Sequence, residues 1–99
     1  MANVSWQVRL DAAYSESQVI EIAHYFLATL DDREVARLPR PCQPRRLRNA
    51  EDIAAYALDL GSCRGTAAEG EGRLVEAMAE FFVRAAKRLG DVSTPTLSE

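Results

Sequence analysis

The fold is decided by the stretch from residue 72 to residue 90, which reads GRLVEAMAEFFVRAAKRLG. Its apolar residues recur every three or four positions, the period of a helix with one buried face. They are Leu74, Met78, Phe81, Phe82, Ala85 and Leu89. Thr66 and Glu69 have the spacing of a capping box, but glycines follow them, so the regular helix is predicted to begin near Gly72. Gly90 is predicted to end it.

Upstream, residues 15–30 repeat the same helical period and supply a second apolar stripe. Ser15 with Gln18, or Ser17 just inside, offers the N-terminal cap. The stripe consists of Val19, Ile22, Ala23, Phe26, Leu27 and Leu30. We expect this helix to pack against the last one, with Phe26, Leu27, Phe81 and Phe82 in the core.

Two further helices are predicted between these stripes. Asp31, Asp32 and Glu34 place negative charge in a new first turn, which favours a short helix ended by Pro39. The alternative is one unbroken helix from residue 15 to Leu38. Farther on, Asn49 is a good cap for a helix over residues 50–60, and Gly61 is predicted as its left-handed stop.

The N-terminal residues show a different period. Val4, Trp6, Val8 and Leu10 alternate with polar residues, which favours a β-strand with one face buried, or else an extended arm. Because no other segment has this alternation, the strand would pair with a short extended piece or with a second copy of the chain. These four residues are therefore the candidate dimer contact.

Together these patterns predict a small, mainly α domain of three to four helices with an N-terminal β-strand or extended arm. The 99 residues form one domain over residues 1–90, followed by a flexible polar tail over residues 91–99. A chain of this size buries a modest core, so association into a homodimer would help its stability. No stretch is apolar for long enough to suggest a membrane partner, and the expected compartment is the cytoplasm.

Arginine is concentrated in one place. Eleven of the twelve cationic residues are arginine, a composition typical of a GC-rich bacterial genome, but six of them fall within residues 33–48. With Glu34 as the only acid, that stretch has a net charge of +5 in a chain of net charge −3. Three prolines interrupt it, so residues 37–48 are predicted to be a surface loop. The candidate anion-binding or ion-pairing residues are Arg37, Arg40, Arg45, Arg46 and Arg48.

Three functions fit these features. The first is a non-catalytic protein–protein interaction or adaptor module, acting as a homodimer, whose arginines pair with acids of the chain itself or of a partner. The second is binding of an anionic ligand or nucleic acid through the loop. It ranks lower because residues 49–80 hold seven acids against two arginines, and because the loop has no aromatic residue for base stacking.

The third function is a small enzyme or ligand-binding domain using His24 and Cys63. Glu21, His24 and Tyr25 form a candidate polar site with groups suited to proton transfer. Cys42 and Cys63 stand too far from other ligands to form a zinc site, so no metal and no cofactor are expected. A disulfide between them is sterically conceivable, but the expected compartment argues against it.

Overall fold

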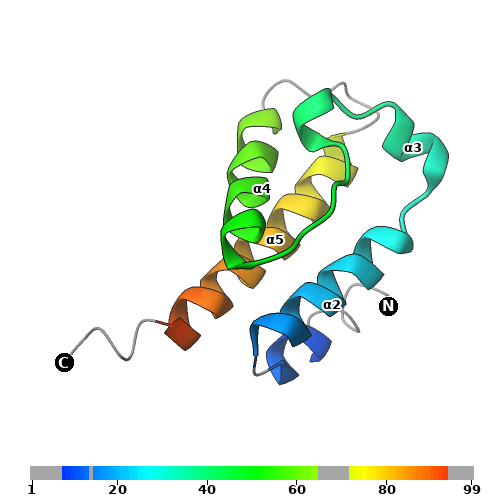
Figure 1. Ribbon diagram of the computed structural model, residues 1–99. Coiled ribbons are helices and arrows are strands. Elements are labelled where there is room, and N and C mark those ends of the chain that lie inside the picture. Colours follow the sequence, from blue (N-terminus) through cyan, green and yellow to red (C-terminus); the bar gives the residue numbers. More distant parts are fainter. Residues whose placement is uncertain (1–7, 14, 65–71, 94–99) are drawn as a thin grey trace.

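The structure is a computed structural model that describes residues 8–13, 15–64 and 72–93. Over these residues the chain is helical and contains no strand, which confirms the mainly α prediction. Figure 1 shows the arrangement, in which α4 and α5 lie side by side and α2 packs against both. The elements, in chain order, are α2 (Glu16–Ala28), α3 (Asp32–Ala36), the 3₁₀ turn η1 (Arg40–Cys42), α4 (Ala50–Cys63) and α5 (Gly72–Ser93).

The helices begin where local capping chemistry places them. The Ser15 side chain accepts a hydrogen bond from the Gln18 N–H, and the Gln18 side chain accepts one from the Ser15 N–H, which completes a capping box. At the start of α3 the Asp31 side chain accepts from the Arg33 N–H, and at the start of α4 the Asn49 side chain accepts from the Asp52 N–H. Residues 15–38 therefore form two helices rather than one.

Two predicted helix ends are wrong. Gly61 lies inside α4, which continues to Cys63, and α5 continues past Gly90 to Ser93. No described glycine has a positive φ, so neither residue adopts the left-handed conformation of a helix stop. Glycine lowers helix stability by about 1 kcal/mol without forbidding the helix, and packing of the neighbouring turns outweighs that cost.

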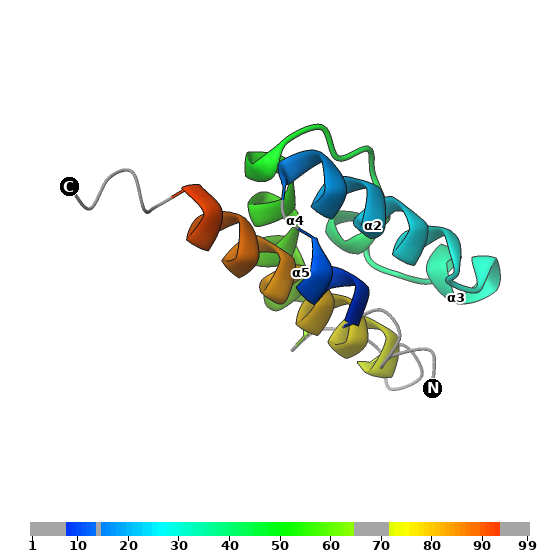
Figure 2. The ribbon, with the colours of Figure 1, turned by 90° about the horizontal axis from the view of Figure 1, so that it is seen from below.

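The predicted N-terminal β-strand is also wrong for the residues of it that the structure describes. Residues 8–12 are helical, and Figure 2 shows them against α5; residues 4–7 lie outside the described residues. The Arg88 guanidinium donates to the Ala13 carbonyl oxygen at 3.0 Å (Nε) and 2.5 Å (Nη2), which closes the end of this short helix. A lone strand would leave its backbone groups unpaired, whereas a helical turn pairs them within the segment.

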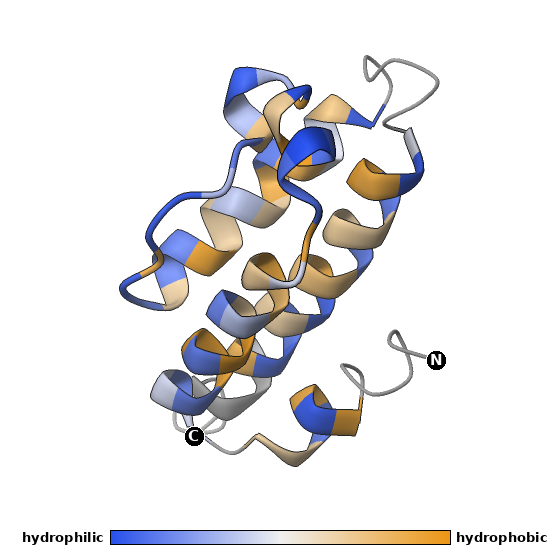
Figure 3. Cartoon of the chain, turned by 90° about the vertical axis from the view of Figure 1, so that its right-hand side faces the viewer, coloured by the Kyte–Doolittle hydropathy of each residue, from blue (hydrophilic) through white to orange (hydrophobic). Residues whose placement is uncertain are grey.

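The core is aromatic at its centre. Phe82 is fully buried and makes edge-to-face contacts with Phe26, Tyr56 and Phe81, with ring centroids 6.2, 4.8 and 5.0 Å away. Phe26 and Phe81 stack at 4.3 Å, so one aromatic cluster joins α2, α4 and α5. Phe26, Phe81 and Phe82 are buried as predicted, and Leu27 is half-buried against them. Figure 3 shows how apolar and hydrophilic stretches alternate along these helices.

Candidate functional site

The Arg/Pro segment, residues 37–48, follows a defined path across the molecule. After η1 it runs back alongside α4 to the N-terminus of that helix (Figure 1). Leu38, Cys42 and Leu47 are buried and anchor its beginning, middle and end in the core. The segment is therefore part of the folded body, although three prolines keep it out of regular helix.

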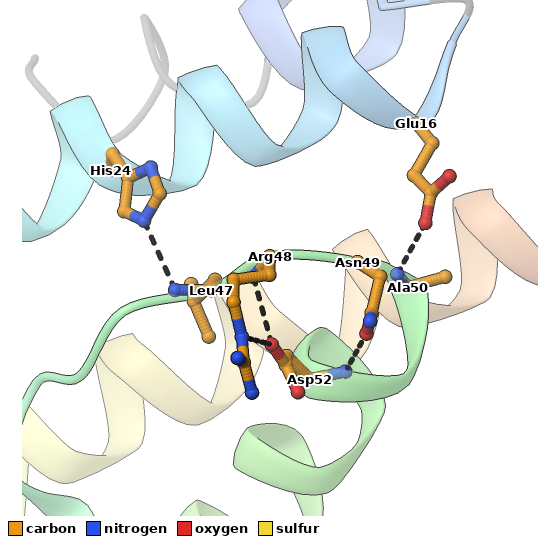
Figure 4. A network of polar contacts seen from close by, with 7 residues as sticks. All are labelled: Glu16, His24, Leu47, Arg48, Asn49, Ala50 and Asp52. Atoms are coloured by element: carbon orange, nitrogen blue, oxygen red, sulfur yellow. Dashed lines mark hydrogen bonds and ion pairs between the residues drawn. The ribbon is translucent and has the colours of Figure 1, made fainter.

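Side chains from outside the segment satisfy its backbone. The Tyr56 hydroxyl donates to the Cys42 carbonyl oxygen at 2.7 Å. On the other side, the His24 Nε2 accepts a hydrogen bond from the Leu47 N–H at 3.2 Å (Figure 4). These contacts hold the middle and the end of the segment between α4 and α2.

Two more polar contacts fix the ends of the segment. The Gln43 side-chain amide donates to the carbonyl oxygens of Val35 and Leu38, at 2.9 and 2.8 Å, which ties the turn to the end of α3. The Glu16 carboxylate of α2 accepts from the Ala50 N–H at 2.5 Å and so assists the cap of α4 (Figure 4). No local pattern in the sequence predicts the contact between Glu16 and Ala50, because the two residues lie 34 positions apart in different helices.

Cys42 and Cys63 form a disulfide, with their Cα atoms 6.8 Å apart. The expectation against this bridge is therefore wrong for the folded chain. It rested on the expected compartment, whereas the fold sets Cys42 of η1 beside the last residue of α4. The bridge adds a covalent attachment to the middle of the Arg/Pro segment.

Two of the candidate arginines are paired with acids of α4. The Arg45 Nη2 lies 2.6 Å from the Asp59 carboxylate, and its guanidinium carbon lies 4.6 Å above the centre of the Tyr56 ring. The Arg48 backbone N–H donates to the Asp52 carboxylate at 2.8 Å, and this hydrogen bond, with the Arg48 charge, lowers the pKa of Asp52. These two arginines therefore help to hold the segment against α4.

Other arginines of this region point to solvent. Arg33, Arg40 and Arg46 are exposed, and within the described ranges their guanidinium groups make no ion pair with an acid. Arg37 is exposed as well. Pairing of Arg45 and Arg48 thus leaves exposed cations in η1 and the following loop, whereas α3 also exposes Asp32 and Glu34.

The candidate polar site is not assembled as a unit. Glu21, His24 and Tyr25 are all exposed on α2, and none of the side-chain hydrogen bonds found among the described residues joins one of them to another. His24 is engaged with the Leu47 backbone, and the Cys63 sulfur is in the disulfide. In this state neither group offers the free base and thiol that the third function would use.

The two described residues of the candidate dimer contact differ in exposure. Val8 is 61% exposed, whereas Leu10 is 2% exposed and belongs to the core of its own chain. Val4 and Trp6 lie outside the described residues. Of the described pair, only Val8 offers apolar surface to a second copy.

Two surface hollows lie among the described residues. One of about 360 Å³ is lined by Arg64, Ala79, Glu80, Val83 and Arg84, and one of about 310 Å³ lies between residues 8–13 and α2 and includes Glu21. In the described ranges no three histidine, cysteine or acidic side chains are placed to share a metal ion. None of the helices described combines the length and the apolar character that a membrane span requires.

Comparison with protein-family models, with curated proteins and with solved structures finds no match to this chain. The functional argument therefore rests on the geometry of the chain itself.

Proposed function

We propose that the protein is a non-catalytic protein–protein interaction module and that the Arg/Pro segment forms its binding surface. The observation that carries the proposal is the way this segment is immobilised. Hydrogen bonds from α2 and α4, a disulfide and three buried side chains hold it, while Arg40 and Arg46 remain exposed. Such preorganisation lowers the conformational entropy lost on binding.

An acidic protein segment is the partner that this surface fits best. Guanidinium groups bind carboxylates with charge-assisted and often bidentate hydrogen bonds. Residues 37–48 contain no aromatic side chain on which a base could stack. Nucleic-acid binding is accordingly the second candidate.

The test compares two variants that remove the same charge. The first, Arg40→Gln/Arg46→Gln, neutralises the proposed surface, and the second, Arg73→Gln/Lys87→Gln, neutralises two exposed cations of α5. Fluorescence anisotropy at about 150 mM salt would follow binding of a labelled twelve-residue Asp/Glu-rich peptide. We expect the first variant to weaken binding by about five- to thirtyfold, because each of the two lost ion pairs contributes about 0.5 to 1 kcal/mol. The second variant should weaken binding by less than about twofold.

Equal losses in the two variants would mean that the peptide responds only to net charge, which would contradict a defined surface. A labelled DNA duplex serves as the competing ligand. Tighter binding of duplex than of peptide, with a steep decrease on added salt, would favour the nucleic-acid function instead.

We further propose that the module is a homodimer in which Val8 contributes to the contact, because this valine remains exposed beside a buried leucine. Light scattering at tens of micromolar is expected to give a dimer mass for the unaltered chain and a lower mass for Val8→Asp. Leu58→Asp is the matched control, because Leu58 is even more exposed but lies on α4. A monomer mass for the unaltered chain would contradict the dimer.

A further inference from the structure

The disulfide lies at the point where the cationic surface meets the core. Cys42 is the last residue of η1, two residues after Arg40 and three before Arg45. Cys63 is the last residue of α4. Cys42 is completely buried and Cys63 is 5% exposed. A bond between them therefore joins the turn that carries an exposed arginine to the end of the helix that the segment follows.

The remaining attachments of this turn are weak and close together. The Tyr56 hydroxyl holds the Cys42 carbonyl oxygen, and the Gln43 amide holds the carbonyl oxygens of Val35 and Leu38. A neutral hydrogen bond contributes only a small net stabilisation because water competes for the same groups. Without the covalent link, local opening of the turn would need these contacts to break and the buried Leu38 and Cys42 side chains to leave the core.

We propose that the Cys42–Cys63 pair is a redox control of the Arg/Pro surface: the oxidised pair holds the surface in its binding arrangement, and reduction by a dithiol releases it. The effect of reduction on binding depends on the proposed function. The release of the segment on reduction does not depend on it.

The exchange follows from the burial of the two residues. On local opening of the turn, a thiolate of the dithiol attacks the sulfur of Cys63, a residue that is 5% exposed against 0% for Cys42, and the bond between the two cysteine sulfurs breaks. Cys42 departs as a thiolate and takes up a proton. The second thiol of the reductant then attacks the mixed disulfide, becomes part of an intramolecular disulfide in the oxidised reductant, and frees Cys63 as a thiol. The protein gains two electrons and two protons.

Opening the bridge also removes a constraint on the unfolded chain. The two cysteines are 21 residues apart, so the bridge closes a loop whose entropy is regained on reduction. For a domain of this size we expect the melting temperature to fall by about 10 to 20 °C. Below that temperature the reduced chain stays folded, with the Arg/Pro segment loosened first.

The experiment compares the full chain before and after treatment with dithiothreitol. Alkylation with iodoacetamide under denaturing conditions, read by mass, is expected to add no group to the oxidised chain and two groups to the reduced one. Hydrogen exchange is expected to quicken by tenfold or more for amides of residues 38–48, with little change in α2. Affinity for the Asp/Glu-rich peptide is expected to fall about tenfold.

A Cys42→Ser/Cys63→Ser variant is the control for side effects of the reductant. It should behave like the reduced chain with or without dithiothreitol. If this variant does not fold, the reduced unaltered chain carries the same comparison, because its exchange and its binding are measured directly.

The outcomes separate the two proposals. Faster exchange in residues 38–48 with no peptide binding in either state would retain the redox-dependent release and refute the binding function. Equal peptide affinity in both states would refute the control. Unchanged exchange after full reduction, or two free thiols in chain treated with oxidised glutathione, would overturn the inference altogether.

Discussion

Replacing Phe82 with alanine is expected to lower the free energy of unfolding by about 3 to 5 kcal/mol, the largest effect of any single substitution considered for this chain. The ring is completely buried and touches Phe26, Tyr56 and Phe81. Removing the ring leaves a cavity between α2, α4 and α5. All three helices would have to move inward to fill it. The loss therefore combines the transfer free energy of the ring with the cost of that cavity.

Chemical denaturation with urea would measure the change. The adjacent Val83 is 48% exposed, so Val83→Ala is the matched control and should cost less than about 1 kcal/mol. A loss below about 1 kcal/mol for Phe82→Ala would place the ring in a loosely filled site and contradict the aromatic cluster as the centre of the core.

The second large effect is expected in alkaline solution and depends on Tyr56. Burial of its phenol raises the pKa of Tyr56 above the ordinary value of 10.0, and Asp59 raises it further against the opposing charge of Arg45. The pKa of Tyr56 is higher in the folded chain than in the unfolded one. The contribution of the neutral phenol to the unfolding free energy is therefore fully present below pH 10 and is lost as the pH rises above it. The unfolding free energy should therefore fall above pH 10, with a slope of at most about 1.4 kcal/mol per pH unit from this group.

Tyr56→Phe isolates this effect. At neutral pH the variant should lose about 1 to 3 kcal/mol, because the Cys42 carbonyl oxygen loses its buried donor. Above pH 10 its stability should then change much less steeply than that of the unaltered chain. Tyr25→Phe is the control, because that side chain is 56% exposed. Identical alkaline slopes for the unaltered chain and Tyr56→Phe would contradict the assignment.

The candidate site could be predicted only in outline. The cluster of arginines and prolines was visible in the sequence, and so was its expected pairing with acids of the chain. The structure pairs Arg45 with Asp59 and Arg48 with Asp52, while Arg40 and Arg46 face solvent. No local pattern separates the paired arginines from the exposed ones, because the difference depends on which side of the segment lies against α4.

His24 illustrates the same limit. From the sequence it was a candidate for proton transfer with Glu21 and Tyr25, but its ring nitrogen accepts a hydrogen bond from the Leu47 backbone. Those two residues are 23 positions apart. The Tyr56 hydroxyl donates to the Cys42 carbonyl oxygen of the Arg/Pro segment, and no local pattern in the sequence predicts that contact either.

The sequence by itself determined the helical class of the protein, the starts of α2, α3 and α4, and the burial of the three phenylalanines. Those features depend on the apolar period and on caps that act over about three residues, as at Ser15, Asp31 and Asn49. The tertiary structure decided that α4 continues past Gly61 and α5 past Gly90, that residues 8–12 are helical, and that the two cysteines pair. Each depends on packing against elements distant in the chain, and such packing outweighs local preferences of about 1 kcal/mol.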